Sequence, residues 1–439
     1  MTNAEMVARS RAAVWHPCTQ MKMHERFPLV PVSRAEGPWL HDFEGRRYLD
    51  GVSSWWVNLF GHAHPAINAA LREQLEQLEH VMLAGFTHAP AVELAERLAA
   101  IAQGHLGHAL FASDGASAAE IALKMAFHYW ANRGEPGKRR FLSLEGGYHG
   151  ETIGALGVTD VEIFRDAYAP LLHPSIVAPF PARSHDDHRF GGIKGAVHAA
   201  DALAKLLEQH AGEVAAFIVE PLVQGASGMR FHHPEYLRRA RSLCTKHRVL
   251  LIADEIMTGF GRTGTMFACE QAGVVPDLIC LSKAITGGYL PLSCVLATDE
   301  VYDAFYDDRM SRAFLHSHSY TGNPLACRAA CAVLDLFARD DVIAVNERNA
   351  ARFSEMASPL AHHPRVRDFR HLGMIWAFEV ASATPDFAAR AFEIALARGV
   401  LLRPIGHTVY FMPPYVVGEP EFRMLVDSAL AIVDALANP

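Results

Sequence analysis

The sequence has no long uninterrupted apolar run and no cluster of basic residues. None of its uncharged apolar stretches approaches the roughly 18 residues that span a bilayer. The 40 lysines and arginines are scattered, are outnumbered by 48 aspartates and glutamates, and form no basic run interleaved with aromatics. These absences predict a protein without a membrane span and without a nucleic-acid partner.

Cysteine is also scarce, with seven residues and no CxxC pair. The segment from Met1 to Val14 is polar and mixed in charge, and it has no apolar signal core. Together these features predict reduced thiols and a cytoplasmic location. The 25 histidines are accompanied by no HExxH motif, so we expect no metal site.

The length and composition allow a large core divided among more than one domain. The chain has 439 residues and is 50% hydrophobic. Short apolar segments alternate with helical patterns through the middle of the chain, which favours a mostly parallel α/β sheet, and a long helical region is expected over 325–358. We predict a large domain over 61–329 and a smaller α+β domain over 330–439, to which an N-terminal segment over 1–60 contributes.

Two apolar runs end in residues of opposite charge. Leu278–Leu281 is followed by Ser282 and Lys283, and Val249–Ala253 is followed by Asp254. Continuous apolar runs suit strands buried on both faces of a parallel sheet, and ligands bind at the carboxyl ends of such strands. A lysine and an aspartate there indicate a site for pyridoxal 5'-phosphate (PLP), held by a Schiff base and paired through its pyridinium nitrogen. The plainer alternatives are a surface lysine and a turn or cap aspartate.

Two glycine-containing segments are candidates for binding a phosphate. Asp114–Ser117 lies between an expected strand and an expected helix, where small residues and free helix N–H groups can hold an anion. The same residues suit an ordinary helix cap. Gly259–Gly264 spells GxGxxG, the fingerprint of a dinucleotide-dependent oxidoreductase, but Glu255–Thr258 separates it from the strand that ends at Asp254. The oxidoreductase is therefore the weaker interpretation.

Aromatic and basic side chains elsewhere are candidates for a substrate site. Trp55 and Trp56 follow two serines in an expected loop, where they form either core packing or a flat wall for a substrate chain. Arg403 stands between apolar residues and before Pro404. It either pairs within the structure or binds a carboxylate.

Taken together, these segments resemble the class III, or ω-type, aminotransferases. The resemblance covers nearly the whole chain, and its motifs are Gly115-Ala116, Tyr148-His149-Gly150, Asp254-Glu255, Phe260–Gly264, Lys283 with Gly287-Gly288, and Gly322–Leu325. It implies the α/β architecture of fold-type I PLP-dependent transferases. It also implies a homodimer with two active sites at its interface.

Three stretches resemble more narrowly the branch of this family that moves an amino group from S-adenosylmethionine to 8-amino-7-oxononanoate in biotin biosynthesis. They are Trp15–Pro17 with Thr19–Met21, Ser53–Trp56, and Arg403-Pro404 with Tyr410 and Met412–Pro414. The resemblance implies a ping-pong reaction in which PLP carries the amino group. The alternatives are lysine as donor to the same acceptor, another ω-amino acid or polyamine substrate, and an aminomutase.

The resemblance also implies a role for each matching residue. Lys283 is the base that moves a proton, Asp254 keeps the ring nitrogen protonated, and Tyr148 lies along the cofactor ring. The residues implied in cofactor binding are Gly115, Ala116, Ser117, Tyr148, Asp254, Lys283, His318 and Ser319, with Ser319 acting from the other subunit. The residues implied in substrate binding are Cys18, Trp55, Trp56, Tyr148, Lys283, Ser317, Arg403 and Tyr410, with Arg403 on the carboxylate of the keto acid.

The chain departs from the family pattern at three places. Cys18 stands where many members have a tyrosine that touches both substrates, and Glu151 stands where aspartate is usual. The loop His316–Thr321 is closer to relatives that use lysine as donor, although those relatives tend to lack the double tryptophan. S-adenosylmethionine is therefore the favoured donor, with lysine as the alternative.

Overall fold

The structure is a computed structural model that describes residues 1–102, 106–181, 192–210 and 212–438. It divides into a larger unit, Ala66–Glu347, and a smaller unit made of Met1–Pro65 with Arg348–Pro439. The boundary expected at residue 329 falls inside α11 (Pro324–Asp340), a helix that belongs whole to the larger unit. The boundary expected at residue 60 lies just before α3 (Pro65–Leu75).

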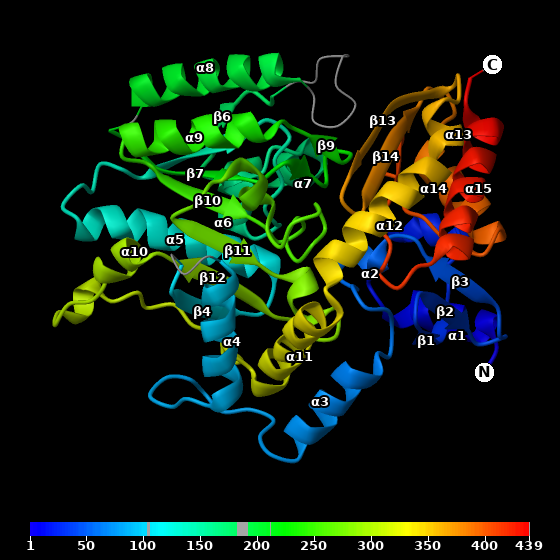
Figure 1. The fold of residues 1–439 in the computed structure, drawn as a ribbon, viewed down its shortest axis with the longest axis horizontal. Helices are drawn as coiled ribbons and strands as arrows, with labels where there is room; N and C mark the ends of the chain where they lie inside the picture. Colours follow the sequence, from blue (N-terminus) through cyan, green and yellow to red (C-terminus); the bar gives the residue numbers. More distant parts are fainter. Residues whose placement is uncertain (103–105, 182–191, 211, 439) are drawn as a thin grey trace. The chain divides into compact units, whose positions relative to one another are not determined.

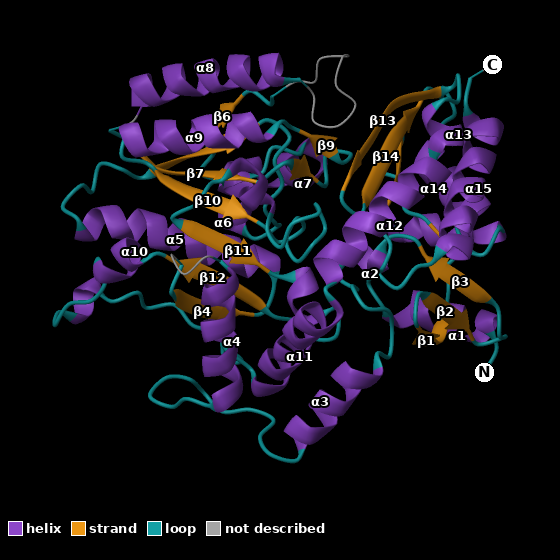
Figure 2. Ribbon diagram, in the orientation of Figure 1, coloured by secondary structure: helices purple, strands orange, loops and turns teal. Residues whose placement is uncertain are grey.

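A seven-stranded sheet forms the centre of the larger unit, in the order β4-β12-β11-β10-β7-β5-β6 (Figures 1 and 2). β12 pairs antiparallel with both of its neighbours, and the other pairs are parallel. The mostly parallel sheet expected from the sequence is therefore confirmed. Its strands are β4 (His108–Ala112), β5 (Arg140–Leu144), β6 (Ile176–Ala178), β7 (Val214–Val219), β10 (Leu250–Asp254), β11 (Leu278–Leu281) and β12 (Ser293–Ala297).

The two strands that lead to Asp254 and Lys283 are buried along their whole length. This is the pattern that continuous apolar runs predict for the interior of a parallel sheet. β10 and β11 are parallel neighbours, with Asp254 opposite Cys280. Their carboxyl ends therefore lie at the same edge of the sheet, and Asp254 and the turn at Lys283 follow there.

Helices pack on this sheet. α5 (Gly115–Asn132) packs on β11, β12 and β7, while α8 (Ile193–His210) packs beside α9 (Pro234–Lys246), as Figure 2 shows. Buried alanines along α5 let it approach the strands closely. The larger unit also contains α4 (Ala89–Ile101), α6 (Ile153–Val158), α7 (Glu162–Arg165) and α10 (Asp299–Asp303). A two-stranded ribbon, β8 (Val223–Gln224) with β9 (Arg230–Phe231), completes the larger unit.

The smaller unit is α+β, with two sheets. One has the order β1-β2-β3-β15 and the other the order β13-β14-β16. The strands are β1 (Val32–Glu36), β2 (Trp39–Asp42), β3 (Arg47–Asp50), β13 (Val366–Leu372), β14 (Ile375–Val380), β15 (Val400–Leu401) and β16 (Thr408–Phe411). The helices are α1 (Asn3–Ala13), α2 (Ser53–Trp56), α13 (Ser358–Ala361), α14 (Phe387–Ala397) and α15 (Glu419–Leu436).

The helical region expected over 325–358 is two helices rather than one. α11 ends at Asp340, and α12 spans Val342–Met356. Asp341 between them has a φ of 46°, a left-handed conformation that interrupts a right-handed helix. The sequence has no glycine or proline at this position. A prediction based on hydrophobic periodicity therefore reads the two helices as one.

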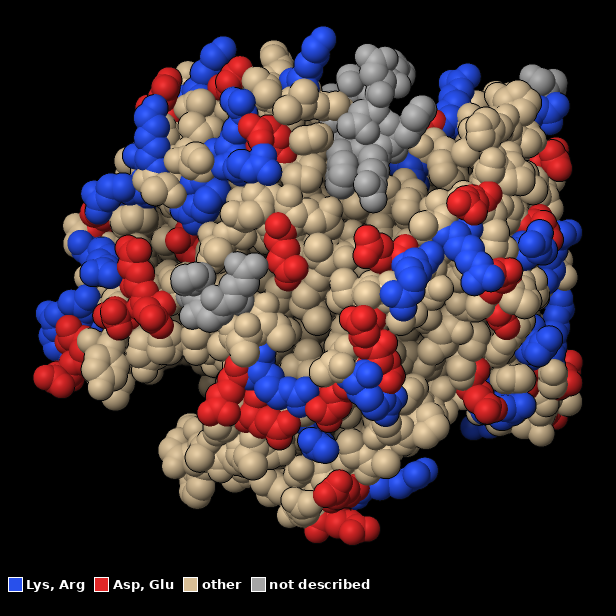
Figure 3. Space-filling view, in the orientation of Figure 1, with Lys and Arg blue, Asp and Glu red and all other residues tan. Residues whose placement is uncertain are grey.

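The described part of the chain was compared with what a membrane protein, a metal protein or a disulfide-bonded protein would show. On the face in Figure 3, basic and acidic side chains lie among one another. No helix within the described ranges is both long and apolar enough to cross a membrane. In the same ranges, no three histidine, cysteine or acidic side chains gather as metal ligands would. The six buried cysteines, Cys244, Cys269, Cys280, Cys294, Cys327 and Cys331, are free thiols.

Candidate active site

Lys283 begins a short 3₁₀ turn, Lys283–Thr286, just beyond the end of β11. Its φ is 46°, a left-handed conformation that is strained for a residue with a side chain. Such strain gathers at ligand-binding and catalytic positions. Burial lowers the pKa of Lys283, and the carboxylates of Asp254 and Glu220 act in the opposite direction. A lowered pKa favours the neutral amine that imine formation requires.

The carboxylate of Asp254 is buried and keeps polar partners. Its Oδ2 accepts a hydrogen bond from Nδ1 of His149 at 2.7 Å, and its Oδ1 accepts from the backbone N–H of Ile256 at 3.1 Å. A carboxylate only accepts, so Nδ1 is the protonated nitrogen of His149 in this arrangement. Each carboxylate oxygen retains a second acceptor position. Asp254 can therefore accept one more donor, such as a protonated ring nitrogen.

His149 is a site residue that sequence reasoning missed. The sequence marked it only as the centre of the Tyr-His-Gly motif and gave it no role. Its ring is buried, and its Nε2 has no hydrogen-bond partner within the described part of the chain. The only signal in the sequence was its position between two motif residues.

Tyr148 and Glu220 lie beside this pair. The backbone N–H of Tyr148 donates to Oε2 of Glu220 at 3.0 Å, and the N–H of Gly225 donates to Oε1 at 3.0 Å. Burial, opposed by His149 and assisted by Asp254, raises the pKa of Glu220 to about 7. The hydroxyl of Tyr148 donates to Glu151 at 2.9 Å, so the unusual glutamate of this chain directly contacts a predicted site residue.

The N-terminus of α5 presents backbone amides near the same edge. Asp114 caps the helix by accepting from the backbone N–H and from the hydroxyl of Ser117, each at 2.9 Å. The amides of Gly115 and Ala116 have no partner within the described ranges. A Cβ at Gly150 would lie 2.5 Å from that of Ala116, so only glycine allows this close packing. The predicted phosphate segment is thus a capped helix start, as both interpretations of the sequence expected, and helix starts bind phosphate well.

A chain of histidines connects to this helix start. Nδ1 of His318 lies 3.4 Å from the hydroxyl of Ser113, and its Nε2 lies 3.3 Å from Nε2 of His316. Nδ1 of His316 lies 2.8 Å from the ammonium of Lys124. Ser317 and Ser319 are exposed. The structure therefore brings His318 toward the phosphate segment and leaves the two serines of the loop at the surface of the single chain.

The GxGxxG segment, Gly259–Gly264, does not open a helix. Residues 255–267 form turns, and Phe260, Gly261 and Gly264 have positive φ. Dinucleotide binding by this motif needs a helix that starts directly after the strand, because the pyrophosphate sits at its N-terminus. The oxidoreductase alternative is therefore wrong.

A second group of predicted residues belongs to the smaller unit, around a pocket of about 530 Å³. Cys18, Trp55 and Arg403 line this pocket. The guanidinium carbon of Arg403 lies 4.4 Å from the ring centre of Trp55, in a cation–π contact. Both side chains are exposed, Trp55 to 39%. Within the described ranges no carboxylate forms an ion pair with Arg403, so its guanidinium is available to a ligand.

Trp56 and Tyr410 are buried rather than part of the pocket lining. The indole N–H of Trp56 donates to the hydroxyl of Tyr410 at 3.0 Å, and the two side chains are 5% and 2% exposed. Burial raises the pKa of Tyr410. Of the aromatic pair in the sequence, Trp55 is therefore the residue that reaches the pocket, and Trp56 anchors the segment.

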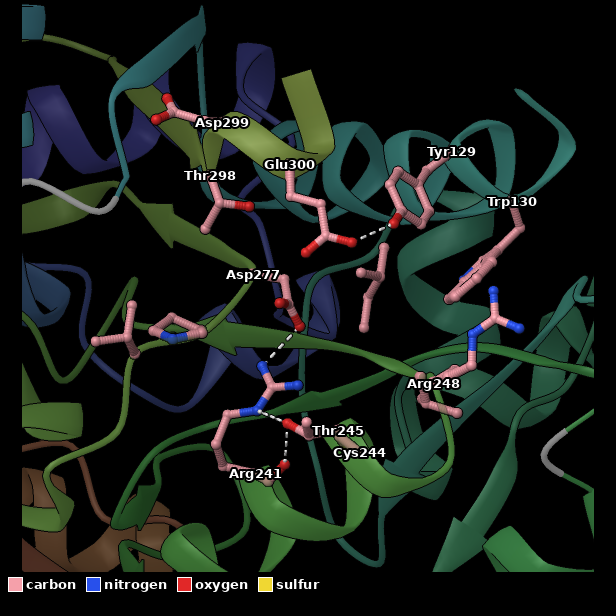
Figure 4. Close-up of a pocket in the computed structure, with 14 residues that line it drawn as sticks. Tyr129, Trp130, Arg241, Cys244, Thr245, Arg248, Asp277, Thr298, Asp299 and Glu300 are labelled. Carbon is pink, nitrogen blue, oxygen red and sulfur yellow. Dashed lines mark hydrogen bonds and ion pairs between the residues drawn. The ribbon is translucent and has the colours of Figure 1, made fainter. Parts of the chain in front are cut away.

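A further cavity, of about 650 Å³, lies at the opposite edge of the large sheet (Figure 4). Its lining includes Leu250 and Asp277, at the amino ends of β10 and β11. Within its lining Arg241 meets Asp277 at 2.7 Å, and Glu300 accepts from the hydroxyl of Tyr129 at 2.8 Å. Ligands of open α/β sheets bind at the carboxyl edge instead, so we place the chemistry there.

Comparisons with known proteins identify the family. The family model described as Aminotransferase class-III matches residues 20–433. The adenosylmethionine-8-amino-7-oxononanoate aminotransferase of Helicobacter pylori is 44% identical over 430 residues, which are 96% of each chain. The crystal structure of the enzyme of that name from Methanocaldococcus jannaschii has a TM-score of 0.92 and 34% identity, covering 99% of both chains. A PLP-bound amine transaminase from an uncultivated Pseudomonas species has a TM-score of 0.90 and 33% identity, covering 96% of this chain and 98% of that chain.

These likenesses extend over both units of the chain, so they are not a match to one domain alone. They confirm the predicted fold-type I architecture and the predicted enzyme class. The chain belongs to the class-III aminotransferase family.

Proposed function

We propose that the protein transfers an amino group from S-adenosylmethionine to 8-amino-7-oxononanoate, giving 7,8-diaminononanoate in biotin biosynthesis, with PLP as cofactor. The observation that carries this proposal is the 44% identity, over nearly the whole chain, to a relative named for that reaction. Solved relatives are described as PLP-bound or in complex with PMP. The site at Lys283 and Asp254 has the chemistry that this cofactor needs.

The side chains at the carboxyl edge of the large sheet fit PLP. Lys283 is the attachment point, and Asp254 accepts from the protonated ring nitrogen. The bound cofactor supplies an electron sink for charge that develops on the substrate carbon. We assign the other cofactor contacts to Tyr148 at the ring, to Gly115, Ala116, Ser117 and His318 at the phosphate, and to Ser319 of the partner subunit.

Lys283 has the proton-transfer role in this proposal. Amino transfer needs one base that takes a proton from the substrate carbon bearing the nitrogen and returns it at the other end of that C–N unit. Burial lowers the pKa of Lys283, which makes a neutral side chain accessible. Asp254, held by His149 and by the Ile256 amide, keeps a proton at the ring nitrogen. Strand pairing fixes the backbone of β10 against that of β11, so the strand that ends at Asp254 is held beside the strand that leads to Lys283.

The acceptor is bound by residues of both polar and aromatic character. Arg403 pairs with the carboxylate of the keto acid, because its planar fork of donors matches that group. Trp55 covers the aliphatic chain. The other substrate contacts that we assign are Cys18, Tyr148, Lys283 and Ser317. Trp56 and Tyr410, which the sequence also suggested, are buried against each other and support Trp55 instead.

A panel of half-reactions tests this function. The PLP form of the enzyme is mixed separately with S-adenosylmethionine, lysine, ornithine and alanine, and the loss of the cofactor absorption band is followed. We expect the fastest loss with S-adenosylmethionine and its reversal by 8-amino-7-oxononanoate. Lysine is the second candidate donor because Cys18 and the loop His316–Thr321 depart from the usual pattern. A faster reaction with lysine would reassign the donor, and failure of the acceptor to restore the band would refute the function.

Replacing Arg403 with alanine is expected to raise the KM for the keto acid about 30-fold, which corresponds to about 2 kcal/mol. This is the lower end of the range for truncating one partner of a charge pair, because solvent reaches the guanidinium in the free enzyme. The KM of Arg403→Lys for the keto acid should lie between those of the wild type and of Arg403→Ala. Lysine keeps the charge but loses the planar set of donors and the stacking on Trp55.

The control for this change is Arg398→Ala, which removes another exposed arginine of the smaller unit, one that does not line the pocket. Steady-state rates at varied keto acid, with donor saturating, give the KM of each variant. A loss confined to the donor half-reaction would show that Arg403 does not bind the acceptor.

We also propose a homodimer in the cytoplasm. In the larger unit, an apolar groove of about 820 Å³ is lined by Phe127, Ile153 and Leu315, which are 48%, 48% and 73% exposed. Exposed apolar surface of this extent suits a second copy of the chain. Sedimentation at micromolar concentration should give twice the chain mass of 48.2 kDa, and a mass of one chain would contradict the dimer. The location is supported by the six buried free thiols and is checked by cell fractionation.

A further inference from the structure

The segment Ser53–Trp56 forms one turn of left-handed helix. Its four φ angles are 52°, 47°, 71° and 73°. The N–H of Trp56 donates to the carbonyl of Val52 at 2.9 Å, and the N–H of Val57 donates to that of Ser53 at 3.0 Å, which closes the turn. Residues with a Cβ disfavour this hand, and glycine alone adopts it freely. The left-handed turn contains no glycine, so its surroundings must hold it.

Asp50 is the main support of the left-handed turn. Its Oδ1 accepts from the backbone N–H of Ser54 at 2.9 Å, and its Oδ2 accepts from the hydroxyl of the same residue at 2.7 Å. Asp50 is fully buried. The carboxylate thus accepts from both hydrogen-bond donors of Ser54, a residue at the centre of the turn, and a right-handed backbone would carry these donors away from it.

His62 completes this support. The side-chain amide of Asn58 lies 3.2 Å from Nδ1 of His62 and can only donate to it, so Nε2 carries the ring proton. That Nε2–H donates to Oδ2 of Asp50 at 3.1 Å. The ring therefore orients the carboxylate toward the turn.

The other contacts of the left-handed turn tie it to β16 and to the residue that follows this strand. The hydroxyl of Ser53 donates to the carbonyl of Met412 at 2.7 Å, and the indole of Trp56 donates to Tyr410 at 3.0 Å. Trp55 alone is left to project from the turn, and its ring meets Arg403 at 4.4 Å. Backbone strain of this kind persists where neighbouring contacts over-determine it, and it gathers at ligand sites.

We propose that Asp50 and His62 are positioning residues for the acceptor: they hold the left-handed turn, and the turn sets Trp55 against Arg403 in the pocket. Neither Asp50 nor His62 is among the residues that line the pocket, so both act through the turn. The inference rests on the proposed function in one respect, that the acceptor carries a carboxylate on an aliphatic chain. Asp50 and His62 would thus shape the acceptor site without touching the acceptor.

A pair of substitutions at Ser54 isolates the handedness of the turn. Ser54→Gly and Ser54→Val both remove the hydroxyl that donates to Asp50, but glycine accepts a positive φ and valine resists it. We expect Ser54→Gly to keep the acceptor KM within about twofold of wild type and Ser54→Val to raise it about tenfold, because small misplacements of a positioning group are costly. The turnover number at saturating acceptor and the cofactor absorption band should stay unchanged in both, as expected when only binding is lost.

Asp50→Ala should raise the acceptor KM as Ser54→Val does, and adding Ser54→Gly in that background should recover part of the loss. Equal KM values for Ser54→Gly and Ser54→Val would overturn the inference, and so would an Asp50→Ala enzyme with unchanged KM. If Asp50→Ala does not fold, the Ser54 pair decides alone. Amination of 8-amino-7-oxononanoate by the wild type tests the proposed function separately. If another carbonyl acceptor serves instead, the same KM comparison with that acceptor decides the role of the turn.

Discussion

Replacing Lys283 with alanine is expected to lower the turnover number about 10⁴-fold, the upper end of the range for removing a proton-transfer group. The effect is this large because one side chain both attaches the cofactor and moves the proton. Burial lowers the pKa of Lys283, and the methyl group of alanine offers no base in its place. The measurement is the single-turnover rate with donor, at saturating added cofactor, so that weaker cofactor binding is not mistaken for slower chemistry.

Lys138 is the matched control for this change. It is also buried, burial lowers its pKa, and its ammonium lies 4.1 Å from the ring centre of Trp130, away from the candidate site. Lys138→Ala should keep the wild-type rate per folded molecule. Borohydride reduction of the wild-type holoenzyme should fix the cofactor on the peptide that contains Lys283. A label on Lys138, or near-normal turnover by Lys283→Ala, would refute the assignment.

The position of Lys283 and Asp254 is the part of the site that the sequence predicts best. Both residues follow continuous apolar runs, and such runs become buried parallel strands whatever the details of the fold. The pairing of β10 with β11 then brings their carboxyl ends to one edge. The helix start at Gly115 follows from the same reasoning, because a short strand, a capping aspartate and an alanine-rich helix are each visible locally.

The contacts that support these residues are not visible in the sequence. His149 and Asp254 are 105 positions apart, and nothing local in either segment indicates that an imidazole meets that carboxylate. Ser53 and Met412 are 359 positions apart, so the tie that holds the left-handed turn is equally hidden. Positive φ is predictable where glycine or asparagine stands, and this turn has neither.

Adjacent identical residues show the same limit. Trp55 and Trp56 are the same residue type and have nearly the same neighbours in the sequence. Trp55 nevertheless lines a pocket, whereas Trp56 is buried against Tyr410. The left-handed backbone of this segment directs the two side chains to different surroundings, and only tertiary contacts determine that it is left-handed. The sequence therefore predicts that the pair matters but not which tryptophan faces a ligand.

Replacing Asp254 with asparagine is expected to slow the donor half-reaction about 10²–10³-fold, the range seen when one preorganised electrostatic partner is lost. Asparagine has nearly the shape of aspartate but only one carbonyl oxygen, so it can accept from Nδ1 of His149 or from the Ile256 amide and not from both. The substitution thus removes the charge, keeps the side-chain volume and leaves one of the two donors without its acceptor. A neutral amide does not favour the protonated ring nitrogen, so the electron sink weakens.

His149→Ala should have a smaller effect of the same kind. It leaves Oδ2 of Asp254 without its donor at 2.7 Å, a loss of about 1–3 kcal/mol for a buried group. Because His149 acts through Asp254, the double variant should lose less than the sum of the two single losses. Full additivity would show that His149 has an independent role.

Asp277→Asn is the control at the other edge of the same sheet. Asp277 precedes β11 as Asp254 ends β10, and it pairs with Arg241 at 2.7 Å. Its replacement should lower stability but not the half-reaction rate per folded molecule, because ligands are expected at the carboxyl edge only. The assignment of the reaction to the carboxyl edge would be refuted if the half-reaction rates of Asp254→Asn and Asp277→Asn both stayed within about tenfold of the wild-type rate. Such a change is well short of the loss expected for an electrostatic partner.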